Sequence, residues 1–167
     1  MRVAVINPWV CDFKLYDEWM HPLGLYFLLS LLQHNGIDTH FFNCLSRLNP
    51  SATKKFGTGQ FSSVVLPKPS VAAHIPRWFK QYGVDSEDLT MFLKSGKAWD
   101  AVLVGSGMTY WAQGVNNTIA QIRRVLPDVP VIVGGTAVRL MPECIDTSGG
   151  NVYIFEGNLL DQSGSSC

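Results

Sequence analysis

Short runs of apolar, mostly β-branched residues recur along the chain, and each is followed by residues that favour turns. Four of the five runs are continuously apolar rather than alternating, which is typical of strands covered on both faces. We therefore predict five buried strands. They lie at 3–6, 37–44, 101–104, 129–133 and 152–155.

Helical periodicity fills the gaps between these runs. Pro22 suits the first turn of a helix, because the N–H that proline lacks has no partner there, and Gly36 suits the left-handed residue that ends one. Apolar residues at helical spacing continue until Pro127, which stops a later helix. The predicted helices are 22–35, 86–95 and 112–126.

The alternation of strands and helices predicts an α/β fold with right-handed crossovers, that is, a doubly wound parallel five-stranded sheet. We expect the common strand order 2-1-3-4-5. Residues 45–83 interrupt the rhythm with several prolines and glycines, so we interpret them as an insertion after the second strand. We expect this insertion to pack over the sheet edge and to add no central strand. The domain is then 1–157, with a tail or linker stub at 158–167.

The composition limits the classes of partner that we expect this protein to bind. Thirteen Lys and Arg balance thirteen Asp and Glu, and no basic cluster is denser than Lys54-Lys55 or Arg123-Arg124. We therefore expect no nucleic-acid partner. The longest apolar run, 24–32, is about half of a bilayer span, so no membrane partner is expected. The start of the chain lacks the pattern of a leader peptide, which favours a cytoplasmic protein.

The cysteines show no metal-ligand spacing. They occur at 11, 44, 144 and 167, without a Cys/His pair at the spacing of a zinc site. An iron–sulfur cluster needs several closely spaced thiolates, which the chain does not contain. We interpret the cysteines as small buried hydrophobes or thiols without a redox role.

In a doubly wound sheet, ligands bind at the carboxyl ends of the strands. The loop 7–21 after the first strand is long and aromatic, unlike a short glycine-rich phosphate loop. A phospho-acceptor receiver domain would need acidic residues at the positions of Asn7 and Gly105, and a lysine near the fifth strand. The chain has no lysine after Lys97, so this class is excluded. The ligand that remains is large, flat and partly apolar.

His21 is the most informative residue of the first loop. It directly precedes a predicted helix at the mouth of the crevice, and Asp17 or Glu18 could orient its imidazole. The alternative is that His21 only precedes the helix. Similar alternatives hold for the other candidates: Ser106 could merely cap a turn, and Gly134-Gly135 could merely end a strand. Four aromatic residues, Trp9, Trp19, Tyr110 and Trp111, are either core or a pocket wall.

Several motifs resemble the cobalamin-binding domain that precedes the catalytic barrel in cobalamin-dependent radical SAM enzymes. Matching features are Asn7-Pro8 after the opening strand, Pro22-Leu23-Gly24-Leu25, the loop 106–111 and the run 131–136. The wider family has Asp-x-His-x-x-Gly, Ser-x-Leu and Gly-Gly after the first, third and fourth strands. His21-Pro22-Leu23-Gly24, Ser106-Gly107-Met108 and Gly134-Gly135 are similar to these, with Met in place of Leu. Trp19 stands where the family has Asp, and Asp17 lies four residues before His21.

The resemblance covers 1–157 and implies a flavodoxin-like domain that binds cobalamin. Such a domain presents the corrin to a radical SAM catalytic domain in cis, which binds S-adenosylmethionine and an iron–sulfur cluster and is absent from this chain. The parent would be a methyltransferase or a related radical enzyme, and this chain alone would not be catalytic. The resemblance implies His21 as the candidate axial cobalt ligand. The implied cofactor-binding residues are Asn7, Pro8, Trp9, His21, Gly24, Gly105, Ser106, Gly107, Met108, Thr109, Gly134, Gly135 and Thr136.

Two other functions stay open. The domain could be a corrin-free docking or lid module, for which a filled and tightly packed crevice would be expected. It could also be a stand-alone enzyme for another small ligand, which would need a converging acid/base pair; Asp17 with His21 is the candidate pair.

Overall fold

The computed structural model describes residues 1–16, 21–46, 61–95 and 98–157, so the predicted tail lies outside the described residues. Its main sheet has five strands that pair in parallel throughout. The predicted α/β class with a five-stranded parallel sheet is therefore confirmed. In chain order the strands are β1 (Arg2–Asn7), β3 (Asp38–Asn43), β6 (Ala101–Ser106), β7 (Val131–Gly135) and β8 (Val152–Phe155).

A second, antiparallel sheet was not predicted. It has the order β2-β5-β4 and consists of β2 (Val10–Asp12), β4 (Ser63–Val65) and β5 (Lys80–Tyr82). With all eight strands numbered in chain order, the main sheet has the order 3-1-6-7-8, which differs from the expected order 2-1-3-4-5. The expected order was written for five strands. If only the five strands of the main sheet are numbered, their order is 2-1-3-4-5.

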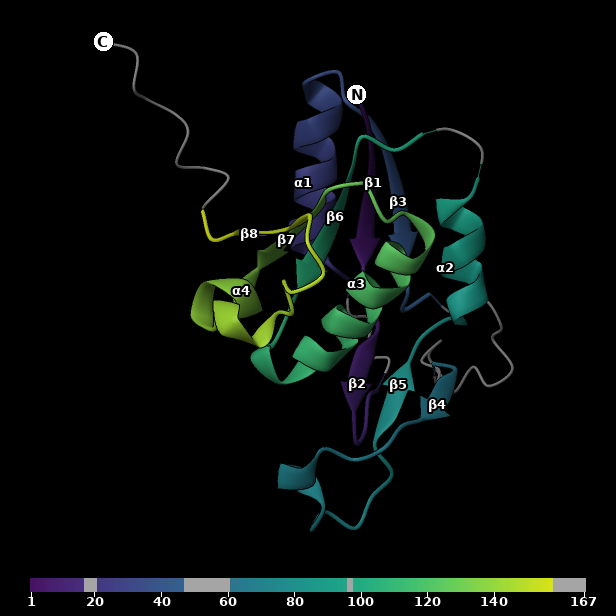
Figure 1. Cartoon of the computed structure of the whole chain (residues 1–167), viewed down its shortest axis with the longest axis vertical. Helices are drawn as coiled ribbons and strands as arrows, with labels where there is room; N and C mark the ends of the chain where they lie inside the picture. The colour runs from purple at the N-terminus through teal and green to yellow at the C-terminus, as the bar shows by residue number, and fades with distance from the viewer. Residues whose placement is uncertain (17–20, 47–60, 96–97, 158–167) are drawn as a thin grey trace.

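The inserted segment is also placed differently than expected. Figure 1 shows the second sheet beyond the carboxyl ends of the main strands, so the described part of 45–83 does not simply cover a sheet edge. No strand from that described part joins the main sheet. Strands of three residues are too short for a recognisable alternation, which explains why the sequence did not indicate them.

The three predicted helices are present with ends within two residues of those expected. Gly36 has a φ of 73° directly after the first of them, as its position required. The fourth helix and the 3-10 turns were not predicted. The helices are α1 (Leu23–His34), α2 (Ser86–Leu93), α3 (Ala112–Val125) and α4 (Thr136–Leu140), and the 3-10 turns are η2 (Ser70–Ala72), η3 (Thr109–Trp111) and η4 (Pro142–Cys144). None of these described helices is long and apolar enough to span a bilayer.

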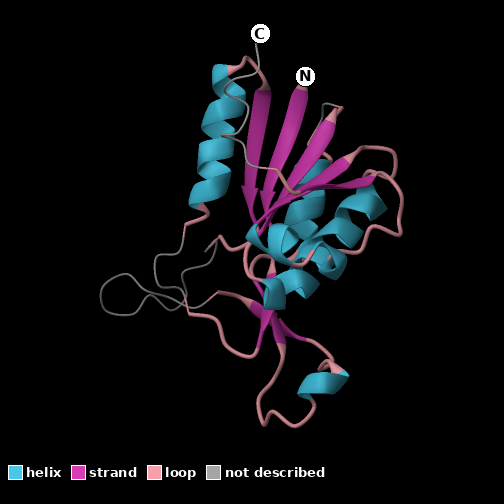
Figure 2. Ribbon diagram, turned by 90° about the vertical axis from the view of Figure 1, so that its left-hand side faces the viewer, coloured by secondary structure: helices cyan, strands magenta, loops and turns pink. Residues whose placement is uncertain are grey.

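The sheet is covered unequally on its two faces. Figure 2 shows α1 alone on one face, with the other helices on the opposite face. The core under α2, α3 and α4 is the larger one, whereas α1 has no fully buried residue and covers Val3 and Val5 of β1. On the α1 side, Tyr153 and Phe155 of β8 are 55% and 38% exposed. The β8 end of this face therefore has little cover among the described residues.

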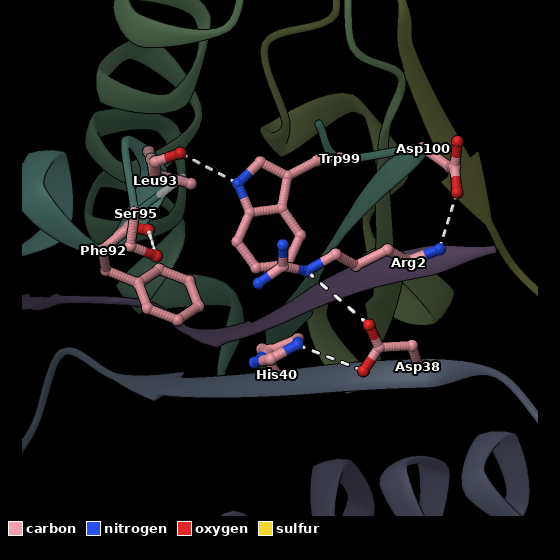
Figure 3. Close-up of polar contacts among 8 residues, drawn as sticks. All are labelled: Arg2, Asp38, His40, Phe92, Leu93, Ser95, Trp99 and Asp100. Atoms are coloured by element: carbon pink, nitrogen blue, oxygen red, sulfur yellow. Dashed lines mark hydrogen bonds and ion pairs between the residues drawn. The ribbon is translucent and has the colours of Figure 1, made fainter. Parts of the chain in front are cut away.

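A charged and aromatic cluster closes the amino-terminal end of the sheet (Figure 3). The guanidinium carbon of Arg2 lies 4.5 Å from the ring centroid of Trp99, and its Nε lies 3.7 Å from an oxygen of Asp38. Asp38 also contacts Nε2 of His40 at 3.1 Å, and Trp99 donates its indole N–H to the carbonyl of Leu93. These contacts join β1, β3 and the segment before β6 at the end opposite the predicted ligand crevice.

Candidate functional site

A pocket of about 700 Å³ opens at the carboxyl ends of the main strands, between α1 and the strands β6 to β8. It receives residues from all three predicted loops. Of the thirteen predicted cofactor-binding residues, those that line the pocket are Asn7, Pro8, Trp9, His21, Gly24, Gly105, Ser106, Gly107, Gly134, Gly135 and Thr136. The structure therefore brings together segments that are up to about 130 positions apart in the sequence.

Glycines form the floor of this pocket. Gly105 and Gly134 are paired in register on neighbouring strands, and Phe155 is the next residue in the same row. A Cβ on Gly105 would lie 3.0 Å from the side chain of Leu25, whereas a Cβ on Gly134 would meet nothing nearer than Phe155 at 3.7 Å. A Cβ on Gly24 would have no neighbour within 4 Å. The space above Gly134 is therefore open, and a flat ligand can approach the backbone.

Ser106 is buried and holds this floor in place. Its hydroxyl donates to the carbonyl of Gly134 at 2.9 Å and accepts the backbone N–H of Val138 at 3.3 Å. Val138 is the third residue of α4, so Ser106 satisfies a helix N-terminal donor that Gly135, without a side chain, cannot reach. Gly135 itself has a φ of 117° and lies against the backbone of Ser106. The hydroxyl is thus used within the protein and positions the pocket backbone.

His21 lies exposed at the rim of the pocket, as expected from its position before α1. Its carbonyl accepts the N–H of Leu23 at 2.8 Å, and its ring centroid is 6.2 Å from that of Tyr26. Asp17 and Glu18, the predicted partners of its imidazole, lie outside the described residues. No group of three or more His, Cys, Asp or Glu side chains in the described chain could hold a metal ion.

The predicted aromatic wall is only partly present. Trp111 lines the pocket and donates its indole N–H to Asp12 at 2.9 Å. Trp9 also lines the pocket, but it is only 2% exposed, and its indole N–H donates to the buried carbonyl of Val84. Tyr110 is 66% exposed and outside the lining. Trp19 lies outside the described residues. Met108 and Thr109, which were predicted to bind the cofactor, are also outside the lining.

The sequence did not single out the apolar side chains or the one cation of the pocket. Leu103 and Ile132 face the same side as the glycine floor, so strand alternation could have indicated them. Arg139 belongs to α4, which was not predicted, and is the only Asp, Glu, Lys or Arg of the lining in the described chain. The pocket thus suits a large apolar ligand that also carries a negative charge. The remaining apolar members are Val10, Leu25, Phe27, Leu28, Leu45, Val104 and Phe155.

Two cysteine thiols are buried beside the pocket strands. Burial raises the pKa of Cys11 to about 12, and it raises the pKa of Cys44 further still. Both thiols are therefore neutral at physiological pH and poor nucleophiles. Their burial agrees with the interpretation of these two cysteines as small hydrophobic core residues.

Comparison with models of protein families gives no match, and a search of curated proteins gives none either. The function is therefore inferred from the pocket. A filled crevice would favour a corrin-free docking or lid module, whereas this pocket is open and has a volume of about 700 Å³. The stand-alone enzyme would need Asp17, which lies outside the described residues.

Proposed function

We propose that this domain binds cobalamin in the pocket above Gly134. One observation carries the proposal: the pocket floor is open above the backbone of Gly134, beside Gly105, which Leu25 covers, and His21 lies at the rim of the same pocket. A broad, flat macrocycle needs this combination of a bare floor and apolar walls. The proposal includes the doubly wound, flavodoxin-like description of the sheet, in which ligands bind at the carboxyl ends of the strands.

The donor set of the pocket fits cobalamin. The four ring nitrogens of the corrin already occupy the equatorial positions of cobalt, so the protein needs to supply one axial ligand or none. A single imidazole at the rim meets that requirement, whereas a cluster of protein ligands would not be needed. Arg139 can pair with the phosphodiester of the nucleotide tail of cobalamin. Leu103 and Ile132 extend the floor with apolar side chains on the same face of the sheet.

The role of these residues is binding and orientation. Bound cobalamin supplies a transferable methyl group, and the chemistry belongs to the cofactor. We propose that a radical SAM catalytic domain, with its S-adenosylmethionine and iron–sulfur cluster, meets the exposed side of the pocket. Tyr153 and Phe155 support this placement, because they leave an apolar surface beside the pocket that a second domain can cover. The parent enzyme is then a methyltransferase or a related radical enzyme.

Reconstitution of the purified chain with hydroxocobalamin tests the proposal through the visible absorption spectrum that remains after desalting. We expect the unmodified chain to retain cobalamin and Gly134→Val to lose it, because the new side chain fills the hollow while its Cβ has room. Gly149→Val is the control, since a Cβ on Gly149 would have no neighbour within 4 Å and Gly149 lies outside the pocket. A chain that retains no cobalamin, or two variants that retain it equally, would contradict the proposal.

The same spectra test the axial ligand. If His21 coordinates cobalt, His21→Ala should retain cobalamin but shift its visible bands, because a ligand of cobalt has been replaced by water. Identical spectra for the variant and the unmodified chain would remove His21 as a ligand and leave cobalamin binding in place.

A further inference from the structure

The neutral total charge of the chain conceals a strong segregation of charge. The stretch 45–84, which contains β4 and β5, has no Asp or Glu at all. Its cations are Arg47, Lys54, Lys55, Lys68, Arg77 and Lys80, six of the thirteen in the chain. A stretch of this composition attracts polyanions, although the net charge of the whole protein does not.

Part of this stretch forms two strands of the antiparallel sheet, β4 and β5 (Figure 1). A second groove, of about 510 Å³, is lined by residues of this sheet and of the segments next to it. Three cations line it, Lys14 next to β2 and Arg77 and Lys80 next to or within β5. In the described part of the chain no Asp or Glu lines this groove. The aromatic members of the lining are Phe13, Tyr16, Phe61, Trp78 and Tyr82.

The aromatic rings of the groove are placed for stacking. Trp78 is 70% exposed and Tyr16 is 50% exposed, although large rings are usually covered. The ammonium nitrogen of Lys14 lies 4.4 Å from the ring centroid of Tyr16, and Phe13 packs on Phe79 with ring centroids 5.2 Å apart. Exposed rings beside cations make a surface on which bases can stack while their phosphates are neutralised.

Asp12, which faces Lys80 across the second sheet, forms hydrogen bonds elsewhere. Asp12 is opposite Lys80 in the sheet register, yet its carboxylate accepts hydrogen bonds from the indole N–H of Trp111 at 2.9 Å and from the N–H of Phe13 at 2.6 Å. No ion pair between Asp12 and Lys80 is present within 4.0 Å. Among the described residues, Asp12 therefore does not neutralise the ammonium group of Lys80.

We propose that this groove binds single-stranded nucleic acid, with bases stacked on Trp78 and Tyr16 and phosphates at Lys14, Arg77 and Lys80. Several cations with two exposed rings in an open groove suit a strand of linked nucleotides better than one nucleotide. The proposal replaces the expectation, based on net charge, that nucleic acid is not a partner. It does not depend on cobalamin binding, because the two pockets share no lining residue.

Fluorescence anisotropy with a labelled oligothymidylate of about ten nucleotides tests the proposal on the full chain. We expect Trp78→Ala to weaken binding about tenfold, since loss of one stacking ring has an effect of this order. Lys80→Gln should weaken binding and reduce the slope of log K against log salt concentration. Lys94→Gln, an exposed cation at the end of α2 and outside the groove, is the control and should change neither affinity nor salt slope beyond error.

Competition experiments show whether the groove recognises linked nucleotides, a single nucleotide or negative charge alone. ATP should compete weakly because it is a single nucleotide, without further nucleotides joined by phosphodiesters. A duplex of the same length should compete weakly because its bases are stacked inside the helix. Polyglutamate should also compete weakly, because it has charge without rings. An absence of oligonucleotide binding, equal affinity of Trp78→Ala, or equal competition by ATP, duplex or polyglutamate would overturn the proposal. Circular dichroism melting of each variant shows whether the fold is retained, and the salt slope of Lys80→Gln remains a second test if Trp78→Ala is unstable.

Discussion

At the scale of single residues, Ser106 connects β6, β7 and α4 through one hydroxyl group. Ser106→Ala removes the hydrogen bond to Gly134 and leaves the buried N–H of Val138 without its partner. We expect the free energy of unfolding to fall by about 1–3 kcal/mol, the usual cost of an unsatisfied buried donor. Urea denaturation followed by circular dichroism measures this loss.

Ser95→Ala is the control for that substitution. The hydroxyl of Ser95 also donates to a carbonyl, that of Phe92, but it is exposed, so water can replace the bond. Its loss should change stability by less than about 0.5 kcal/mol. Equal effects of the two substitutions would show that Ser106 does not hold the pocket backbone as described.

Local sequence indicated which residues belong near the site but not what each side chain contacts. Glycines after β6 and β7 were recognisable, because turns and close approach favour glycine wherever they occur. The partner of Trp9 was not, because its indole meets the carbonyl of Val84, 75 positions away. Such contacts depend on the tertiary fold, so the same tryptophan could be interpreted equally well as core or as pocket wall.

At the scale of elements, two helical glycines should respond in opposite ways to alanine. Gly24 in the first turn of α1 has no neighbour within 4 Å of an added Cβ, so Gly24→Ala should stabilise the protein by about 0.4–1 kcal/mol. Gly114 in α3 lies against the backbone of Trp9, where an added Cβ would overlap the carbonyl oxygen. Gly114→Ala should therefore destabilise it by about 1–3 kcal/mol, despite the higher helix propensity of alanine.

Chemical denaturation of the two variants under the same conditions checks this difference. A stabilised Gly114→Ala would mean that α3 and the Trp9 backbone are not in close contact. The comparison is matched, because both changes add one methyl group within a helix and differ mainly in what the methyl meets.

The length of a helix or strand determined whether the sequence pattern could predict it. The helices α1 and α3 have 12 and 14 residues, long enough for their periodicity and their ends to be recognised. The strands of the second sheet have three residues each, and α4 has five. Those short elements depend on their neighbours rather than on their own pattern, and α4 brings Arg139 to the pocket.

At the scale of the whole molecule, the lining residues place the main pocket at the carboxyl ends of the main strands and the second groove on the antiparallel sheet. Figure 1 shows that sheet beyond the same ends, and the Arg2 cluster of Figure 3 closes the opposite end. Total composition could not reveal this arrangement, because a net charge of zero is the sum of a cationic insertion and a more acidic remainder. The strand and helix pattern predicted the location of the main pocket, since that location follows from the topology.

The buried thiols make stability depend on alkaline pH. The ordinary pKa of a thiol is 9.0, and burial raises the pKa of Cys11 to about 12 and that of Cys44 as well. Below pH 9.0 both thiols are protonated in the folded and the unfolded chain, so their contribution to stability is fully present. As the pH rises above 9.0, the unfolded chain loses these protons while the folded chain keeps them. Unfolding is then increasingly favoured until the folded pKa is reached.

We therefore expect the free energy of unfolding to be steady near neutral pH and to fall above pH 9.0, by at most about 1.4 kcal/mol per pH unit for each thiol. Urea denaturation at neutral pH and at several values above 9.0 measures the slope. Cys44→Ala lowers stability at every pH, because it leaves a cavity in the core, but it removes one titrating thiol and should make the decline shallower. If the slope of Cys44→Ala equals that of the unmodified chain, other groups cause the alkaline loss, and the burial of this thiol is not what couples the fold to pH.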